Sequence, residues 1–307
     1  MKYKVLLPEN ISDKGLIYLE MHDCETLVLD DASVENVCAH VTDCDAILVR
    51  NSELSREVFE CAKKMKVIAR HGVGVERIDL ETAKEHGVIV TTTPGANSNA
   101  VAEHTIALIM ACAKNIPFFH DKTKEGDWVL RDTMKTVEVS KKTLGLIGYG
   151  QISRLVAKKA ALGLDMKVLV YRTHKEEKLP DYIQEVECME DIFKTSDFVS
   201  FHMPLREDTK GVVNQKMIHL MKPNAYFINT ARGGCVDHDA LYEALKNHKI
   251  AGAALDVFEV EPPDIKEPLF ALDNVILSPH NAAHTVEAMD NMAVIAAENI
   301  VRILQEK

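Results

Sequence analysis

The sequence predicts an α/β fold built from two doubly wound domains with parallel sheets. Short apolar runs alternate with helical patterns along almost the whole chain, which is typical of parallel strands joined by helical crossovers and covered on both faces. A length of 307 residues, 47% of them hydrophobic, is sufficient for two domains with separate cores. A glycine-rich turn near the middle of the chain follows the first strand of the second sheet.

The first part of the chain contains nine short segments in which strand and helix patterns alternate. The expected strands are Tyr3–Leu7, Leu27–Leu29, Ala46–Val49, Val67–Ala69 and Val88–Val90. The expected helices are Ser12–Met21, Ser33–Val41, Ser55–Lys63 and Asp79–His86. These segments make a complete α/β unit before the glycine-rich turn is reached.

A long apolar helix is expected at Ser98–Lys114, where it links the first unit to the second. Its largely apolar run, residues 105–113, is too short to cross a bilayer. Residues 117–139 are polar, carry the single tryptophan, Trp128, and show no strong period, so we expect a helix plus an extended arm.

Residues 143–153, TLGLIGYGQIS, have the pattern of a strand, a glycine turn and the start of a helix. Gly148 permits the tight turn and Gly150 lets the backbone approach a pyrophosphate, while the helix start offers N–H groups to the phosphates. Two glycines alone also fit an ordinary turn, and Ser153 stands at the third glycine position. In this context the pattern predicts a Rossmann-type dinucleotide site.

An arginine occupies the position where an acidic residue usually binds the adenosine ribose. Arg172 follows the next expected strand and lies 172 − 150 = 22 residues after Gly150. With Thr173 and Lys175 beside it, Arg172 favours a 2′-phosphate, and therefore NADP over NAD. Solvated surface charge is the alternative interpretation.

The second unit continues with strand-like runs that are mostly separated by helical segments. Its expected strands are Leu144–Ile147, Val168–Tyr171, Phe198–Phe201, Tyr226–Asn229, Ala253–Val257 and Val275–Leu277. Six strands are the expected size of a dinucleotide-binding domain. The last segment, residues 287–305, places Met292, Ala296, Ile300 and Ile303 on one helical stripe. Because it has no strand of its own, we expect it to pack on the first unit.

Charge and cysteine content argue against several classes of partner. The formal net charge is 36 − 47 = −11 with no basic stripe, which disfavours nucleic acid and anionic membrane surfaces. The seven cysteines are scattered and contain no Cys-x-x-Cys pair, which suits a reducing cytoplasm and no structural metal. The N-terminal apolar run is too short for a secretory signal. We therefore expect a cytoplasmic protein.

Three segments that follow strand-like runs carry candidate chemical groups. Arg232 lies in NTARGG, His280 lies in SPH, and Glu261 heads a loop in which two prolines stop any helix. Each residue alone also fits a surface or structural position at a turn. Ligands of open α/β sheets bind at the carboxyl ends of the strands, so we expect the three side chains to meet beside the dinucleotide.

These three groups together fit the reduction of a 2-oxo acid. That reaction needs a hydride, a cation that holds the substrate carboxylate and polarises its carbonyl, and an acid that protonates the developing alkoxide. Arg232 is the predicted cation. His280 is the predicted acid, because histidine titrates nearest neutrality, and Glu261 is predicted to keep it protonated.

Longer motifs make the chain resemble the D-isomer-specific 2-hydroxyacid dehydrogenase family over almost its whole length. These motifs are ARHGVGVERID (69–79), TPGANSNAVAEHT (93–105), GLIGYGQIS (145–153), FHMPL (201–205), NTARGG (229–234), AALDVFEVEPP (253–263) and SPH (278–280). The resemblance is closest to the phosphoglycerate dehydrogenase branch without a regulatory domain, so serine feedback is not expected. It implies a Rossmann-type cofactor domain, residues 99–284, inserted into a smaller flavodoxin-like substrate domain, residues 1–98 plus 285–307. It also implies a homodimer through the cofactor domains.

The resemblance further implies roles for individual residues. The catalytic residues would be Arg232, Glu261 and His280, and Asp256 would bind the nicotinamide carboxamide. The backbone of Val73 and Gly74 would receive the substrate carboxylate. The full set of predicted substrate-binding residues is Arg50, Arg70, Val73, Gly74 and Arg232, in which Arg50 and Arg70 suit an anionic or phosphorylated substrate. The predicted cofactor-binding residues are Gly148, Tyr149, Gly150, Gln151, Ile152, Arg172, Thr173, His202, Pro204, Thr209, Thr230, Ala231, Asp256 and His280.

The sequence thus predicts an oxidoreductase that transfers a hydride between NAD(P) and a small D-2-hydroxy or 2-oxo acid. The expected type is a phosphoglycerate dehydrogenase or a hydroxypyruvate/glyoxylate reductase. The alternatives are a cofactor-sensing, peptide-binding corepressor and a formate dehydrogenase. Formate dehydrogenases similar to this chain carry glutamine at the position of Glu261. Ser153, Arg172 and the segment 281–283 depart from the family pattern, and they leave the cofactor preference and the substrate open.

Overall fold

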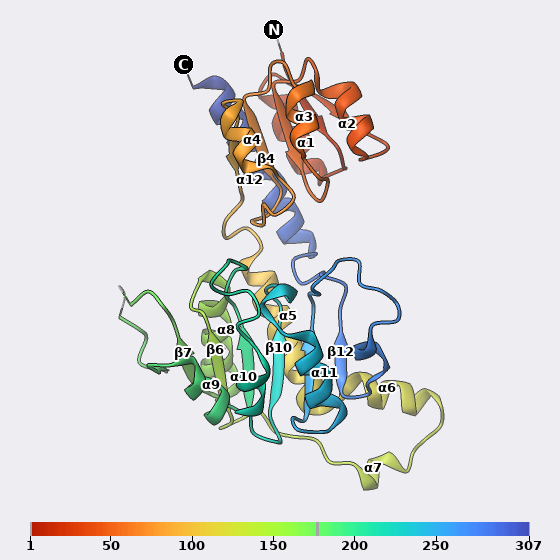
Figure 1. Ribbon diagram of the computed structural model, residues 1–307, viewed down its shortest axis with the longest axis vertical. Coiled ribbons are helices and arrows are strands. Elements are labelled where there is room, and N and C mark those ends of the chain that lie inside the picture. Colours follow the sequence, from red (N-terminus) through yellow and green to blue (C-terminus); the bar gives the residue numbers. More distant parts are fainter. Residues whose placement is uncertain (1, 176–177, 307) are drawn as a thin grey trace. The chain divides into compact units, whose positions relative to one another are not determined.

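The computed structural model describes residues 2–175 and 178–306. The chain divides into two compact units, one made of Met1–Asn97 with Ala283–Lys307 and the other of Ser98–Ala282. The boundaries predicted after residues 98 and 284 lie within two residues of these positions. Figure 1 shows the elements of each unit with their labels.

The first unit is built on a parallel sheet with the strand order β2-β1-β3-β4-β5, which is the flavodoxin-like order. The strands are β1 (Tyr3–Leu7), β2 (Cys24–Val28), β3 (Ala46–Val49), β4 (Val67–Arg70) and β5 (Ile89–Thr91). They lie within a few residues of the predicted apolar runs. The prediction of a parallel α/β unit is confirmed.

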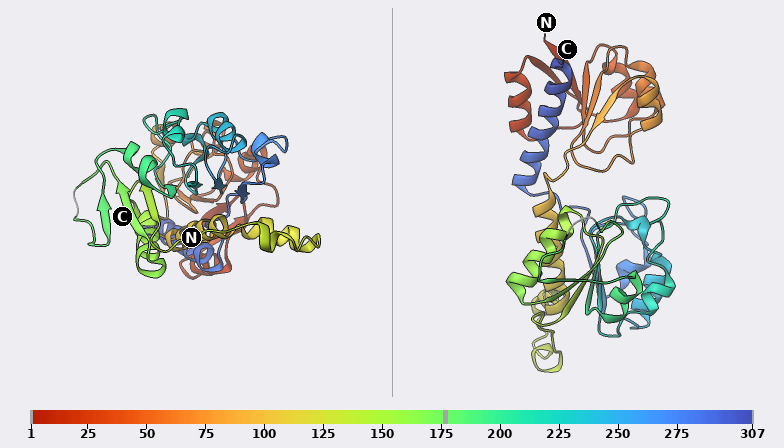
Figure 2. Two further views of the ribbon diagram at one scale, coloured as in Figure 1. Left: turned by 90° about the horizontal axis from the view of Figure 1, so that it is seen from below. Right: turned by 90° about the vertical axis from the view of Figure 1, so that its left-hand side faces the viewer.

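Helices cover both faces of this sheet (Figure 2, right). They are α1 (Asp13–Met21) and α12 (Val286–Gln305) on one face, and α2 (Val34–Val41), α3 (Arg56–Cys61) and α4 (Leu80–Glu85) on the other. Neighbouring residues of one strand therefore enter different cores: Val5 packs with the α12 cluster, and Leu6 packs with the α2–α3 cluster. Burial on both faces explains why these strands are continuous apolar runs.

Helix α12 completes the first unit although it comes from the end of the chain. It contacts α1, β3 and β4, which confirms the predicted packing. Met292, Ala296 and Ile300 of the predicted stripe are fully buried, and Ile303 is partly buried. The Thr285 hydroxyl accepts a 3.1 Å hydrogen bond from the Ala288 amide and caps the helix.

The second unit contains a parallel sheet with the order β12-β11-β10-β9-β6-β7-β8. The strands are β6 (Thr143–Ile147), β7 (Lys167–Tyr171), β8 (Ile183–Glu185), β9 (Phe198–Phe201), β10 (Tyr226–Asn229), β11 (Gly252–Leu255) and β12 (Val275–Leu277). The chain runs outward from β6 to β8 and then continues on the opposite side of β6 with β9. This reversal creates the crevice at which open α/β sheets bind their ligands.

Two helical layers enclose the second sheet (Figure 2, right). Helices α5 (Ser98–Lys114) and α8 (Gln151–Leu164) pack on one face, and α9 (Met189–Thr195), α10 (Gln215–His219) and α11 (His238–Lys246) pack on the other. Short 3₁₀ turns, η1 (Gly233–Cys235) and η2 (Pro268–Ala271), lie in the loops. Helix α5 has the predicted bounds and contacts α8, β10 and β11.

One strand of this unit was not predicted from the sequence. All six predicted strands are present, but β8 was not expected, because its three residues, Ile183–Glu185, contain a single apolar side chain within a polar segment. It pairs with β7 in parallel and so extends the sheet beyond the predicted edge.

The segment after α5 forms the predicted helix and arm. Helices α6 (Ile116–Lys124) and α7 (Leu130–Thr133) extend away from the rest of the second unit (Figures 1 and 2). They leave apolar side chains in solvent, since Trp128 and Val129 are 66% and 68% exposed.

Candidate active site

The glycine turn joins β6 to α8 at the reversal point of the second sheet. Gly148 has a φ of +94°, and a Cβ there would lie 3.0 Å from the His202 carbonyl oxygen, so glycine is required. Gly150 is the N-cap residue that precedes α8, and a Cβ there would meet no atom within 4 Å. No side chain caps α8 within the described structure, which leaves its first amides to an anion. The turn therefore fits the pyrophosphate of a dinucleotide.

The other residues of the predicted fingerprint stabilise this turn. Ser153 is fully buried and its hydroxyl donates a 2.7 Å hydrogen bond to the Gly148 carbonyl, so serine holds the turn where a third glycine was expected. Ile152 packs into the α5–α8 core, and the Gln151 side chain accepts a hydrogen bond from Ser98. The Arg154 guanidinium stacks on the Tyr149 ring, 4.6 Å from its centre.

The ends of the two strands beside β6 flank the turn directly. The Gly148 N–H donates to the Tyr171 carbonyl at the end of β7 (2.9 Å), and the His202 N–H after β9 donates to the Ile147 carbonyl (2.8 Å). Burial lowers the pKa of His202 to about 4, so this ring is neutral at pH 7. The Thr209 hydroxyl donates to the Pro204 carbonyl (2.6 Å) and fixes the loop after β9.

Arg172 is occupied by a carboxylate that the sequence analysis did not identify. Its side chain is only 8% exposed, and its Nε and Nη2 each lie 3.1 Å from an oxygen of Glu185, the last residue of β8. Lys175 lies 2.6 Å from Glu187, while Thr173 is exposed beside it. The guanidinium that was expected to bind a 2′-phosphate thus forms a bidentate ion pair within the protein.

The segment after β10 is braced from within. The side chain of the buried Asn229 accepts from the Ala231 amide and donates to the Arg232 carbonyl, both at 2.9 Å. Thr230 contacts the Thr105 hydroxyl of α5 at 3.0 Å. A Cβ on Gly233 would lie 2.0 Å from the Phe258 carbonyl carbon. Glycine at this position therefore lets the loop after β11 approach the Arg232 segment.

His280 and Glu261 form a hydrogen-bonded pair next to Arg232. Nδ1 of His280 lies 2.6 Å from Oε2 of Glu261, whose other oxygen accepts from the Phe258 amide at 3.0 Å. Burial raises the pKa of Glu261, but the bonds from His280 and Phe258 and the charge of Arg232 bring that pKa below its usual value. Because the ionised Glu261 accepts from Nδ1–H, the other nitrogen of His280, Nε2, is the one left for proton transfer.

Asp256 anchors the loop that carries His280. Its carboxylate is fully buried and accepts from the Ser278 hydroxyl (2.6 Å) and from the amides of Asn281 and Ala282 (3.0 Å each). His104 of α5 lies 3.0 Å from the Ser278 hydroxyl oxygen. Because Ser278 donates to Asp256, His104 Nε2 is the donor in that contact. Ser278 and His104 lie within motifs noted in the sequence, but their spacing does not reveal this network.

The loop after β4 presents backbone amides in the first unit. Arg70 donates from Nε to the Gly74 carbonyl (2.8 Å) and from Nη1 to the His71 carbonyl. The Gly72 amide donates to the Thr93 hydroxyl at 2.9 Å. Within the described residues, the N–H groups of Val73 and Gly74 have no hydrogen-bond acceptor. Arg70 therefore binds the carbonyl groups of this loop, and the amides that were predicted to receive a carboxylate remain available.

A carboxylate that the sequence analysis missed organises the loop after β3. Glu9 accepts hydrogen bonds from the amides of Arg50 (3.0 Å), Asn51 (2.6 Å) and Ser52 (2.6 Å). The Arg50 guanidinium donates to the Asn10 carbonyl at 2.9 Å. Nearby, burial and the charges of Arg50 and Arg70 lower the pKa of His71 to about 4, so this histidine is neutral.

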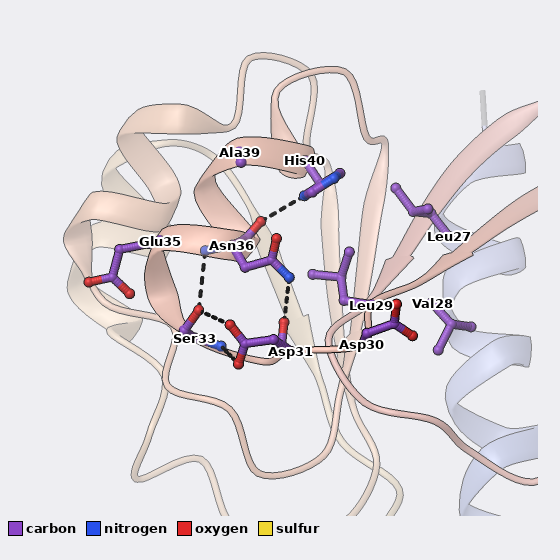
Figure 3. Close-up of a pocket in the computed structure, with 10 residues that line it drawn as sticks. All are labelled: Leu27, Val28, Leu29, Asp30, Asp31, Ser33, Glu35, Asn36, Ala39 and His40. Carbon is purple, nitrogen blue, oxygen red and sulfur yellow. Dashed lines mark hydrogen bonds between the residues drawn. The ribbon is translucent and has the colours of Figure 1, made fainter.

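A separate hollow in the first unit contains none of the predicted site residues (Figure 3). It lies at the end of β2 and the start of α2, and its lining residues are Leu27, Val28, Leu29, Asp30, Asp31, Ser33, Glu35, Asn36, Ala39 and His40. Its polar groups bind one another: Asp31 accepts from the Ser33 amide (3.1 Å) and its carbonyl from the Asn36 side chain (2.6 Å). These bonds hold the loop before α2 and cap that helix, and they do not form a catalytic site.

Residues 2–175 and 178–306 contain neither a metal-binding cluster nor a membrane-spanning helix. Within them, no group of three or more histidine, cysteine, aspartate or glutamate residues is placed to hold a metal ion. No helix in that part of the chain is long and apolar enough to cross a bilayer.

Comparison with known proteins agrees with this geometry. Residues 106–282 match the family described as D-isomer specific 2-hydroxyacid dehydrogenase, NAD binding domain. The chain is 40% identical over 305 residues to D-3-phosphoglycerate dehydrogenase of Methanocaldococcus jannaschii, which covers 98% of this chain and 57% of that protein. It is 41% identical over 267 residues to hydroxypyruvate reductase of Thermotoga maritima, with 86% of each chain covered. The chain thus spans a little over half the length of the phosphoglycerate dehydrogenases that it matches.

Solved structures show the same fold. A protein of Thermus thermophilus superimposes with a TM-score of 0.90 at 32% identity, covering 98% of this chain and 97% of that one. The NADPH-dependent glyoxylate/hydroxypyruvate reductase of Sinorhizobium meliloti, solved with NADP and malonate, superimposes with a TM-score of 0.87 at 26% identity, covering 99% and 94%. From the matched NAD-binding domain and relatives of this identity and coverage, the chain belongs to the D-isomer-specific 2-hydroxyacid dehydrogenase family.

Proposed function

We propose that this protein is an NAD(P)-dependent oxidoreductase that interconverts a small D-2-hydroxy acid and its 2-oxo acid. The observation that carries the proposal is the His280–Glu261 pair beside Arg232, at the carboxyl ends of β10, β11 and β12. These strands belong to the sheet whose glycine turn fits a dinucleotide. A proton donor, a fixed cation and a cofactor turn are the components that this reduction requires.

Each residue has a distinct task in this mechanism. Bound NAD(P) would supply the hydride. Arg232 would bind the substrate carboxylate and polarise the 2-oxo group, because a guanidinium forms paired hydrogen bonds with a carboxylate. His280 would donate the proton from Nε2 to the developing alkoxide, and Glu261 would hold the ring orientation and stabilise its positive charge. In the first unit, the amides of Val73 and Gly74 and the guanidinium of Arg50 stay predicted groups for binding an anionic substrate.

The substrate class that we propose is a short 2-oxo acid with a polar or phosphorylated 3-position. Support comes from relatives named D-3-phosphoglycerate dehydrogenase, hydroxypyruvate reductase and glyoxylate reductase. Those names also favour an oxidoreductase over a peptide-binding corepressor. Glu261, where formate enzymes carry glutamine, favours a reaction that needs a proton donor over formate oxidation.

The decisive experiment measures initial rates of cofactor oxidation by the purified protein. NADH and NADPH are compared against hydroxypyruvate, glyoxylate, pyruvate and 3-phosphohydroxypyruvate. Turnover of one or more of these acids supports the proposal and ranks the substrates. No turnover with any of the four, under conditions in which the protein binds nucleotide, would overturn it.

We also propose a homodimer through the second unit. Ile116, Trp128 and Val129, along the segment that carries α6 and α7, are exposed apolar side chains that suit burial against a second copy. Light scattering coupled to size-exclusion chromatography should give twice the mass of one chain. A monomer at micromolar concentration would contradict this.

The cysteines are free thiols, which supports a reducing compartment, the cytoplasm, as the location of the protein.

A further inference from the structure

The end of β7 is where the structure gives information about cofactor choice. The Gly148 amide bonds the Tyr171 carbonyl at 2.9 Å, so the residues that follow Tyr171 lie directly beside the glycine turn. A dinucleotide whose pyrophosphate lies at the start of α8 directs its adenosine ribose to this strand end. Arg172 and Thr173 are therefore the residues that face the ribose 2′-position.

The unexpected strand β8 supplies a carboxylate to the same place. Glu185 pairs with Val170 in the parallel register, and its side chain reaches past the end of β7 to Arg172. Two parallel contacts of 3.1 Å, from Nε and Nη2 to the two carboxylate oxygens, make the bidentate geometry that guanidinium groups form with anions. The Glu185 carboxylate thus occupies the Nε–Nη2 edge of Arg172, one of the edges at which a guanidinium binds a phosphate.

The charges around this pair are balanced. Lys175 lies 2.6 Å from Glu187 and 3.9 Å from Glu185. The hydrogen bond from Arg172 lowers the pKa of Glu185, which is therefore ionised at neutral pH. Two cations thus face two carboxylates at this site. A 2′-phosphate carries up to about two negative charges and would meet no net positive charge from these four residues.

We propose that Glu185 is a specificity-determining residue that disfavours NADP by occupying Arg172. A 2′-phosphate would have to displace Glu185 from an arginine that is only 8% exposed, or bind beside an ionised carboxylate. The 2′-hydroxyl of NAD brings no charge and meets neither cost, so NAD is the cofactor that this arrangement favours. The inference rests on the proposed function, because it assumes that the glycine turn binds a dinucleotide.

The test compares two substitutions that remove the same charge at different places. Glu185→Gln keeps one oxygen acceptor for Arg172 but removes the negative charge. Glu187→Gln, the control, removes a charge that pairs with Lys175 and not with Arg172. Dissociation constants of NAD⁺ and NADP⁺ are measured by calorimetry without substrate, so that the result does not depend on turnover. Thermal unfolding of each variant verifies that it is folded.

The expected result is a change in selectivity confined to Glu185. Glu185→Gln should shift the ratio of the two dissociation constants towards NADP⁺ by about tenfold or more, the typical effect of one charged hydrogen bond. Glu187→Gln should shift the ratio by less than about twofold, the effect of an exposed ion pair. Glu185→Ala, which removes both acceptors, should shift it in the same direction as Glu185→Gln and provides a second variant if one fails to fold.

Two outcomes would overturn the inference while leaving the proposed function intact. If both nucleotides bind and the Glu185 variants leave the ratio unchanged, Arg172 does not contact the ribose. If NADP⁺ binding weakens instead, Glu185 orients Arg172 for a phosphate rather than competing with one. If the unmodified protein binds neither nucleotide, the proposed function fails together with the inference.

Discussion

The two units share one architecture but carry different chemical groups at the carboxyl ends of their strands. In the second unit the strand ends carry titratable and charged side chains, Arg232, Glu261 and His280. In the first unit the loop after β4 offers the backbone amides of Val73 and Gly74, and its arginine binds carbonyl groups of the same loop. Proton transfer needs a side chain with a suitable pKa, whereas receiving a carboxylate needs only amides held in a fixed orientation.

The largest effect is expected from a substitution among the titratable side chains of the second unit. His280→Ala removes the proposed proton donor and should lower kcat by about 10²–10⁴-fold, with the Kd for the cofactor changed by less than about twofold. Stopped-flow rates and nucleotide fluorescence titration measure the two quantities. Turnover that survives the substitution would show that another group supplies the proton.

A smaller loss is expected when His280 is kept and its partner is changed. Glu261→Gln retains the shape of the side chain but no longer stabilises a charged His280, so kcat should fall by about tenfold to a hundredfold. The alkaline limb of the pH–rate profile for 2-oxo acid reduction should also move to lower pH, because reduction needs a protonated donor and a neutral partner no longer favours that form. An unchanged profile would mean that Glu261 serves the fold rather than the reaction.

The same carboxylate makes a prediction about stability. The pKa of Glu261 is lower in the folded protein than its usual value of 4.5. Its ionised form therefore stabilises the fold above the usual pKa, and this contribution is lost as the pH falls through the lower, folded value. Urea unfolding between pH 6 and pH 3 should show a smaller acid sensitivity for Glu261→Gln than for the unmodified protein. Equal sensitivity would contradict it.

The backbone side of the comparison is tested by Arg70→Lys. One ammonium group cannot reproduce the paired bonds of a guanidinium to the His71 and Gly74 carbonyls, so the amide loop should lose its fixed orientation. KM for the 2-oxo acid should rise about tenfold, with kcat changed by less than about twofold. Arg56→Lys, in an exposed ion pair with Glu85, is the control. Equal KM values for the two variants would show that Arg70 does not hold the amide loop in the orientation that the substrate needs.

The smallest effect concerns the helix that completes the first unit. Thr285→Ala removes the cap of α12 and should lower its opening free energy by about 1 kcal/mol. Hydrogen–deuterium exchange of α12 peptides measures this value, and Thr285→Ser, which keeps the hydroxyl, is the control. No difference between alanine and serine would show that the cap contributes nothing measurable.

Most of the fold was predictable because strand and helix patterns are local. Adjacent strand residues such as Val5 and Leu6 are buried on opposite faces of the sheet, so the strand is a continuous apolar run. Such a run can be recognised in the sequence without knowledge of what packs against it. Strand β8 was missed because Ile183 is its single apolar residue. The types of residue at the candidate site were predictable for the same reason, since His280, Glu261 and Arg232 each follow a legible strand.

The partners of these residues were not predictable, because they come from elsewhere in the chain or from the backbone. Arg172 carries a positive charge in any reading of the sequence, but its effect depends on Glu185, which reaches it through the missed strand. Arg70, a predicted substrate-binding residue, donates to two carbonyl oxygens of its own loop, and the residue type alone does not reveal such backbone partners. Glu9 bonds three amides more than forty residues away in the chain.

The origin of α12 at the end of the chain has a consequence for synthesis. Residues such as Val5, Leu48 and Ala69 form a sheet face that packs against α1 and α12. The ribosome finishes the first unit's sheet near residue 91 but does not complete α12 until residue 305. At about 5–20 residues per second, the interval is on the order of ten to forty seconds. During that time the second unit is synthesised in full, while part of the first core lacks the helix that covers it. A chaperone therefore has an apolar surface to bind in this interval.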